Sequence, residues 1–204
     1  MRANPLSVAF AMLVLSACPG VLRSDRTHTR RDRWQQPERV IESLRLRPGD
    51  HVVDLGAGGG YFTFRLADAV GPTGRVYAVE IDEKRARTLE RERREGGVSN
   101  VEVILARPDD PLLPDGEIDL VFLCNAYHHI EDRASYFDRL RVDLKRDGRV
   151  AIVDGNDALA WLTLGHFRTS AARHAEMTAA HYQRAQTYDF LLFQNFEVFA
   201  AGGS

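Results

Sequence analysis

HVVDLGAGGG, residues 51–60, decides the fold of this chain. Its first five residues have the apolar content of a short buried strand, and helical spacing begins at Tyr61. Glycines between a strand and a helix permit positive φ and let a ligand approach the backbone closely. Free N–H groups at the start of the following helix favour a carboxylate or phosphate. Residues 51–60 therefore predict a strand–loop–helix unit with a ligand site at the loop, although nicotinamide and flavin proteins use a similar loop.

Strand and helix patterns alternate beyond this unit. Further strands are predicted at 75–79, 101–106, 118–123 and 150–154, and helices at about 36–46, 61–70, 82–95, 133–144 and 168–180. The segments 183–190 and 195–201 predict two strands in a hairpin. Strands that alternate with helices of this length form βαβ units. The fold class expected is therefore α/β: a Rossmann-like, doubly wound, mostly parallel seven-stranded sheet with a C-terminal antiparallel hairpin.

Composition excludes several classes of protein. The chain has 204 residues, of which 44% are hydrophobic and 27% charged, and this is ordinary for one globular domain. A formal net charge of −2 argues against nucleic acid as a partner bound through bulk charge. Two cysteines cannot make a disulfide-stapled scaffold.

The N-terminus has the pattern of an export signal. Arg2 precedes an uncharged apolar run over 6–17, which is too short for a conventional span of ~30 Å of hydrocarbon. The run ends in Leu-Ser-Ala-Cys18, which resembles the lipobox of bacterial lipoproteins. We expect a signal peptide at 1–17, lipidation of Cys18, a tether at 18–33 and the folded domain at 34–204. The alternatives are an uncleaved anchor or a chance cysteine, and a cytoplasmic protein if the signal is unused.

Acidic residues follow three of the predicted strands. Asp54 lies two residues before the first glycine of the loop, where a carboxylate repels a pyrophosphate but suits an ammonium or sulfonium group. Glu80 ends the second strand and can accept hydrogen bonds from both hydroxyls of a ribose. Asp109, after the third strand, can accept from an adenine amino group or serve as a plain turn residue.

Four segments together resemble the class I S-adenosylmethionine-dependent methyltransferases, in particular small-molecule enzymes related to quinone-biosynthesis methyltransferases. They are VVDLGAGGGYF, VYAVEID, ARPDDPLLPDGEIDLVFLCNAYHHI and LKRDGRVAIVDG, and the resemblance covers about residues 34–201. It implies S-adenosyl-L-methionine as cofactor, with its methionine part at Asp54 and the loop glycines, its ribose at Glu80 and its adenine at Asp109. The cofactor-binding residues implied are Asp54, Gly56, Ala57, Gly58, Gly60, Glu80, Ile81, Asp109, Asp110 and Asn125.

The loop after the fourth strand, Asn-Ala-Tyr-His-His-Ile130, supplies candidate catalytic residues. His128 or His129 can remove a proton from an accepting oxygen or nitrogen. The alternatives are one histidine capping a helix while the other packs, or a metal site completed by Glu131 and Asp132, although adjacent histidines diverge. No metal is therefore expected.

Aromatic residues elsewhere are secondary candidates. Trp34 is expected to place an N-terminal helix over the cofactor as a lid, and Trp161 and His166 to line the acceptor wall. Tyr61 and Tyr127 can face the transferable methyl group or pack in the core.

Three functions remain open at this point. The first is an S-adenosylmethionine-dependent methyltransferase, exported or lipid-anchored in a bacterial cell envelope, with a small-molecule or membrane-associated acceptor. The second is a non-catalytic lipoprotein that binds S-adenosylmethionine or another nucleoside. The third, a nicotinamide-dependent reductase, is disfavoured by Asp54 and by the lack of a separated tyrosine–lysine pair.

Overall fold

A computed structural model describes residues 29–164 and 166–202. The predicted signal peptide and Cys18 lie outside these residues. Within them, no helix is both long and apolar enough to cross a bilayer.

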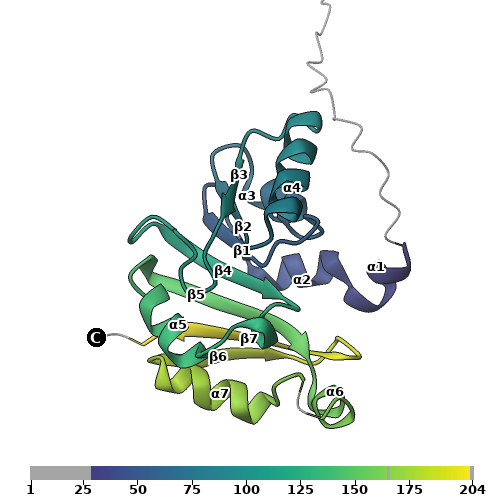
Figure 1. The fold of residues 1–204 in the computed structure, drawn as a ribbon, viewed down its shortest axis with the longest axis vertical. Coiled ribbons are helices and arrows are strands. Elements are labelled where there is room, and N and C mark those ends of the chain that lie inside the picture. The colour runs from purple at the N-terminus through teal and green to yellow at the C-terminus, as the bar shows by residue number, and fades with distance from the viewer. Residues whose placement is uncertain (1–28, 165, 203–204) are drawn as a thin grey trace, which may run out of the picture.

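One seven-stranded sheet organises the molecule, in the order β3-β2-β1-β4-β5-β7-β6 (Figure 1). The strands are β1 (His51–Leu55), β2 (Arg75–Glu80), β3 (Val101–Leu105), β4 (Ile118–Cys124), β5 (Leu144–Gly155), β6 (Tyr182–Tyr188) and β7 (Gln194–Ala201). Strands β1 to β5 are parallel, whereas β7 runs antiparallel to both β5 and β6. The predicted α/β class, strand number and C-terminal hairpin are confirmed.

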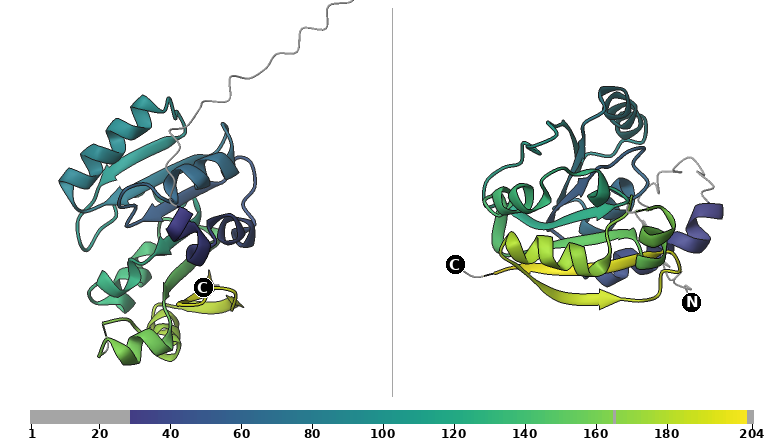
Figure 2. Two further views of the ribbon diagram at one scale, coloured as in Figure 1. Left: turned by 90° about the vertical axis from the view of Figure 1, so that its right-hand side faces the viewer. Right: turned by 60° about the horizontal axis from the view of Figure 1, so that its bottom comes forward.

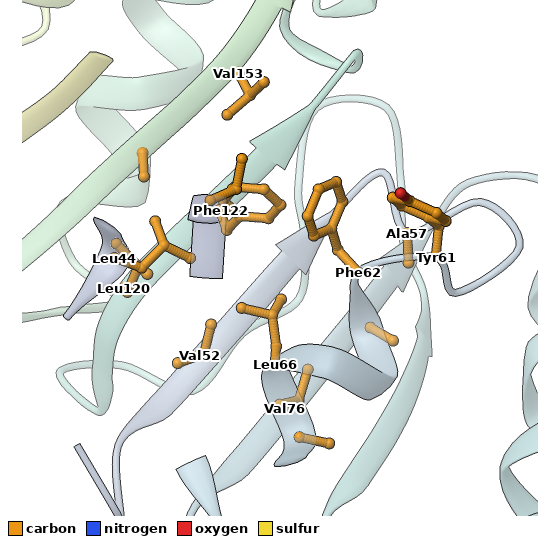
Figure 3. Packing of buried hydrophobic residues seen from close by; sticks show 14 of the residues in the cluster. Leu44, Val52, Ala57, Tyr61, Phe62, Leu66, Val76, Leu120, Phe122 and Val153 are labelled. Carbon is orange, nitrogen blue, oxygen red and sulfur yellow. The ribbon is translucent and has the colours of Figure 1, made fainter. Parts of the chain in front are cut away.

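Helices cover both faces of this sheet. They are α1 (Thr29–Gln35), α2 (Pro37–Leu44), α3 (Thr63–Val70), α4 (Glu83–Glu95), the 3₁₀ turn η1 (Tyr127–His129), α5 (Arg133–Leu140), α6 (Asp157–Leu162) and α7 (Ser170–Ala179). Successive strand residues point to opposite faces, so Val52 joins a core with α2 and α3 while Val53 joins one with α5 and α7. In the first core Phe62 packs edge-on against Phe122, with ring centroids 4.9 Å apart (Figure 3).

Several elements differ from the sequence prediction, and two of the differences concern α1 and α5. The predicted tether includes residues 29–33, but these are helical in α1, where Asp32 accepts a hydrogen bond from Tyr61 of the domain. The helix predicted at 133–144 ends at Leu140, because Leu144 pairs with Ile118 as the first residue of β5.

A buried ion pair joins α7 to the antiparallel end of the sheet. Arg173 Nε donates to Glu197 Oε2, and both side chains are fully buried. Ser170 Oγ and Arg184 Nη1 donate to the other carboxylate oxygen, at 2.9 and 3.0 Å.

We expect Glu197→Ala to lower the free energy of unfolding by about 3–5 kcal/mol, because it leaves the Arg173 guanidinium buried without its carboxylate. Chemical denaturation measures this change. The matched control is Glu102→Ala, since Glu102 is half exposed in its ion pair with Arg75 and should cost about 0–1 kcal/mol. Equal losses of unfolding free energy in the two variants would show that breaking the buried pair costs no more than breaking the exposed one.

Candidate active site

The glycine loop leaves β1 with its backbone in the left-handed region. Gly56, Gly58 and Gly60 have φ of 80°, 56° and 76°. The N–H groups of Gly56 and Ala57 both donate to the carbonyl of Val79, at 2.9 and 3.0 Å, and this ties the loop to β2. A Cβ on Gly56 would lie 2.6 Å from the Cβ of Ala126. The loop therefore requires glycine at position 56 both for its φ and for its close approach to the loop after β4.

Asp54 lies beneath this loop, almost wholly buried, with 3% of its surface exposed. Its Oδ2 accepts a hydrogen bond of 2.6 Å from the Thr63 hydroxyl. Burial raises the pKa of Asp54 from 3.8 to about 6, against the opposing effects of the Thr63 hydrogen bond and the Arg31 guanidinium. Such a carboxyl gains most from a cation placed next to it.

This raised pKa predicts how stability depends on pH. The folded state prefers protonated Asp54. The stabilisation that this preference adds to the free energy of unfolding is fully present below pH 3.8 and is lost as pH rises through about 6. Between pH 7.5 and pH 4.5 we expect the unfolding free energy of the wild type, relative to Asp54→Asn, to rise by about 1–3 kcal/mol. Denaturation of both proteins across this range measures the difference. Parallel pH profiles of the two proteins would refute the raised pKa of Asp54. Burial also raises the pKa of Asp143 to about 6, but Asp143 is present in both proteins, so its effect cancels in the comparison.

Glu80 ends β2 on the other side of the glycine loop, with 4% of its surface exposed. Its Oε2 accepts from the N–H of Gly58 at 2.9 Å, and its Oε1 accepts from Ile81 and Asp82 at 2.9 and 3.0 Å. A carboxylate has about four acceptor positions, so about one remains, on Oε2. Glu80 therefore holds the loop in place and keeps one free position for a ligand hydroxyl.

The remaining residues expected at the adenine end are on the surface. Ile81 is 59% exposed beside Glu80. Asp109 is exposed, and its main-chain carbonyl accepts from Arg139 at 3.3 Å. The Oδ1 of Asp110 accepts from the N–H of Leu112 at 2.8 Å. One oxygen of Asp110 is therefore engaged in a local turn, which favours a structural role for this residue.

A chain of amides closes the far side of the site. Asn125, which follows β4 with φ of 56°, accepts at Oδ1 from Gln194 Nε2 at 2.7 Å. Gln194 Oε1 in turn accepts from Gln35 Nε2 at 2.6 Å. Gln35 belongs to α1, so this chain fixes α1 across the carboxyl edge of the sheet.

Helix α1 also contacts the glycine loop directly. The Arg31 guanidinium lies 3.7 Å from the centre of the Tyr61 ring, and the Tyr61 hydroxyl donates to Asp32. Helix α1 therefore lies beside the glycine loop, and its role as a lid stays a prediction. Tyr127 is fully buried and stacks on Phe137, which makes it a core aromatic.

His128 and Asp154 form a hydrogen-bonded pair after β4 and at the end of β5. His128 Nδ1 lies 2.9 Å from Asp154 Oδ1, and the His128 N–H donates to Asp154 Oδ2 at 3.0 Å. The Gly155 N–H donates to Asp154 Oδ1 at 2.8 Å, and the carboxylate is fully buried. A carboxylate at Nδ1 selects the tautomer with its proton on Nδ1, and this leaves Nε2 as an acceptor. Within the described part of the chain, Nε2 has no hydrogen-bond partner.

His129 has a different environment. Its ring centre lies 4.0 Å from that of His128, and His129 is mostly exposed. Partial burial and the neighbouring His128 and His166 lower the pKa of His129. Among the described residues no cluster of three or more His, Cys, Asp or Glu side chains could hold a metal ion.

A cavity of about 460 Å³ opens beside His128. Its lining is mainly aromatic and apolar, with the two histidines and two amides at one side: Trp34, Asn125, His128, His129, Gly155, Leu159, Phe167, Phe193 and Gln194. Trp161 was expected in this wall but is 79% exposed and does not line it, because α6 turns its side chain outward. His166 was also expected in this wall and is not among its lining residues; its ring centre lies 4.9 Å from that of His128.

Sequence reasoning missed three residues of this site: Asp154, Gln194 and Gln35. Asp154 had a visible signal, since it is an acid at the carboxyl end of a predicted buried strand. Gln35 and Gln194 had none, because they meet only through contacts between distant segments.

The fold and this site define the class of protein: a doubly wound domain with a glycine loop between β1 and α3, two buried acids at the strand ends and an adjoining cavity. Residues 46–195 match the family model described as a methyltransferase domain, and the chain belongs to this family.

Curated relatives and solved structures agree with this assignment. Over 114 residues the chain is 32% identical to nocamycin O-methyltransferase of Saccharothrix syringae, and over 116 residues it is 30% identical to the ubiquinone/menaquinone biosynthesis C-methyltransferase of Hydrogenovibrio crunogenus. These matches span 56% of this chain but 41% and 46% of the two relatives, so the chain spans less than half of their lengths.

Among solved structures, a SAM-dependent methyltransferase from Aquifex aeolicus superposes with a TM-score of 0.77 at 21% identity, over 84% of this chain and 92% of that one. A geranyl diphosphate methyltransferase solved in complex with SAM superposes with a TM-score of 0.67 at 15% identity, over 83% and 85%. These likenesses establish the shared fold.

Proposed function

We propose that this chain is an S-adenosylmethionine-dependent methyltransferase that methylates a small molecule bound in the cavity beside His128. The observation that carries the proposal is the placement of Asp54 and Glu80, both almost wholly buried, on either side of a loop that requires glycine. The cofactor supplies an electrophilic methyl group on a sulfonium. The family membership and the names of the relatives support this choice of reaction.

The residues present fit such a cofactor. Asp54 offers a buried carboxyl that would be ionised by a neighbouring cation. Gly56, Ala57, Gly58 and Gly60 let the backbone approach the methionine part, and Glu80 keeps one acceptor position for a ribose hydroxyl. Ile81, exposed beside Glu80, offers an apolar side chain to the adenine, and Asp109 and Asp110 lie at the edge of that region. Asn125 borders the site from the opposite side, through its bond to Gln194.

We propose His128 rather than His129 as the catalytic base. His128 Nε2 would take the proton from the accepting atom, and Asp154 would hold the ring in position and stabilise the imidazolium that forms. His129 makes no hydrogen bond to a carboxylate among the described residues, and Asp154 is bound to His128 instead. Methyl transfer otherwise needs alignment of donor and acceptor in a water-excluding site, and alignment supplies ~7–11 kcal/mol of such barriers.

A base is required only for an acceptor that binds in its protonated form, so the dyad favours a hydroxyl-bearing acceptor. The aromatic lining of Trp34, Phe167 and Phe193 favours a flat apolar molecule. The relatives are, by name, methyltransferases of a natural product and of quinone biosynthesis, and both names support a small-molecule acceptor.

The test is transfer of labelled methyl from S-adenosylmethionine to a panel of phenols, hydroxyquinones and aliphatic alcohols. We expect label in at least one phenol or hydroxyquinone and none in the aliphatic alcohols. Tight cofactor binding with no transfer to any acceptor would instead indicate the non-catalytic binding protein.

The cell-envelope location is also part of the proposal. The N-terminal sequence supports a signal peptide at 1–17 and lipidation of Cys18, with the domain at 34–204. A lipid anchor would place the enzyme near membrane-associated acceptors. Mass spectrometry of the mature N-terminus tests this location, and an intact Met1 would contradict it.

A further inference from the structure

Five large apolar side chains lie exposed on two neighbouring segments, α6 with the residues after it and the turn between β6 and β7. We call them the apolar rim: Trp161 (79% exposed), Leu162 (65%), Leu164 (97%), Leu192 (70%) and Phe193 (49%). Isolated exposed apolar residues are ordinary, but a contiguous group marks an interaction surface.

Hydrogen bonds hold the two segments of the rim against each other at the start of α6. Asn156, the N-cap of α6, donates from its N–H to the carbonyl of Phe193 at 3.1 Å and from its side chain to the carbonyl of Leu192 at 3.2 Å. Helix α6 and the β6–β7 turn are therefore fixed against each other. Both lie on the right-hand side of Figure 1, which the left panel of Figure 2 turns toward the viewer.

The rim borders the mouth of the cavity. Leu159 of α6 and Phe193 of the turn both line the cavity beside His128. Trp34 of α1 also lines this cavity. A partner that binds to the apolar rim would therefore also lie next to the entrance of the cavity.

Arginines lie on the other side of the rim. Gln36 donates to the carbonyl of Phe190 at 2.8 Å, and the Arg39 guanidinium lies 4.1 Å from the Phe190 ring, so the start of α2 is fixed to the β6–β7 turn. Arg30, Arg33 and Arg39 are exposed there. Residues 30–47 contain six arginines and three acidic residues.

We propose that the apolar rim and these arginines dock this face on the surface of an anionic lipid bilayer. Trp and Leu side chains enter the boundary between headgroups and acyl chains, and nearby arginines pair with lipid phosphates. A bilayer fits better than a second copy of the chain, because arginines outnumber acidic residues six to three over residues 30–47 and two such positively charged segments would repel. Docking brings the cavity mouth to the lipid, so an acceptor dissolved in the bilayer can enter; this last step alone rests on the proposed function.

The test is flotation of the full chain with phosphatidylcholine vesicles, with and without phosphatidylglycerol. Leu162→Ser with Leu164→Ser should lower the partition coefficient about tenfold. The matched control is Val142→Ser. Val142 is 63% exposed but lies where β4 and β5 begin, away from the rim, and its carbonyl accepts from the N–H of Gly116. Residues 1–28 are identical in all these proteins, so any contribution they make cancels.

Two further readouts separate the parts of the surface. Trp161 emission should shift to the blue on vesicles in the wild type and in Val142→Ser, but not in the double leucine variant. Arg30→Gln with Arg33→Gln should remove most of the dependence on phosphatidylglycerol, whereas Arg87→Gln with Arg91→Gln on α4 should not.

Unchanged partitioning and unshifted emission in the double leucine variant would overturn the proposal. So would a dimer in solution that the same variant converts to a monomer, with no dependence on lipid. Neither readout requires cofactor or turnover, so loss of docking and failure of the methyltransferase assignment are distinguishable.

Discussion

Replacement of His128 by Asn should lower the rate of methyl transfer by about 10²–10⁴-fold, the usual contribution of a positioned general base. Among the described residues Nε2 of His128 has no hydrogen-bond partner, and the other ring nitrogen is bound to buried Asp154. The loss should fall on kcat, because the substitution leaves the glycine loop and the buried acids Asp54 and Glu80 intact. The measurement is transfer of labelled methyl to the acceptor that the panel identifies, with cofactor affinity measured separately by calorimetry.

The matched control is His129→Asn, which removes the adjacent imidazole and should leave kcat close to the wild-type value. Asp154→Asn should impair transfer in the same direction as His128→Asn, because an amide can present its N–H to Nδ1 and favour the wrong tautomer. ¹⁵N NMR of the His128 ring checks this directly, with the proton on Nδ1 in the wild type. A His129→Asn variant as slow as His128→Asn would show that the two rings act together or that the base is misassigned.

Replacement of Glu80 by Ala should weaken the binding of S-adenosylhomocysteine by more than tenfold without unfolding the chain. The substitution removes a charge-assisted bond to a ribose hydroxyl, worth ~1.5–3 kcal/mol, and the acceptor that holds the N–H of Gly58. Isothermal titration calorimetry measures the affinity. Glu83→Gln is the control, since Glu83 lies three residues away on α4 and is 62% exposed.

A second ligand separates the two roles of Glu80. Wild-type protein should prefer adenosine to 2′-deoxyadenosine, and Glu80→Gln should lose most of this preference. If the variant binds both ligands more weakly but retains the preference, Glu80 acts only through the loop. Unchanged affinity for S-adenosylhomocysteine would remove Glu80 from the site altogether.

Local sequence patterns predicted the parts of this site that single segments carry. The strand, the glycines and Asp54 are contiguous, and Glu80 is marked by its place at a strand end, so periodicity and spacing located them. Asp154 reaches His128 across 26 residues, and Gln35 reaches Gln194 across 159. Such partners depend on the order of strands in the sheet, which no local pattern contains.

The lack of long-range information in local patterns also explains why the predicted and observed elements differ. Residues 29–33 of α1 were assigned to a tether because they show no apolar period, yet Asp32 accepts a hydrogen bond from Tyr61. Helix α6 has six residues, too few for a period to be recognised, and Asn156 begins it through a bond to the N–H of Leu159.

A structure of the complex with S-adenosylhomocysteine tests the central claim most directly. We predict one ribose hydroxyl within hydrogen-bond distance of Glu80 Oε2, the homocysteine ammonium beside Asp54 and the sulfur facing the cavity that His128 lines. A nucleoside bound elsewhere, or a glycine loop left empty at saturating ligand, would contradict the account.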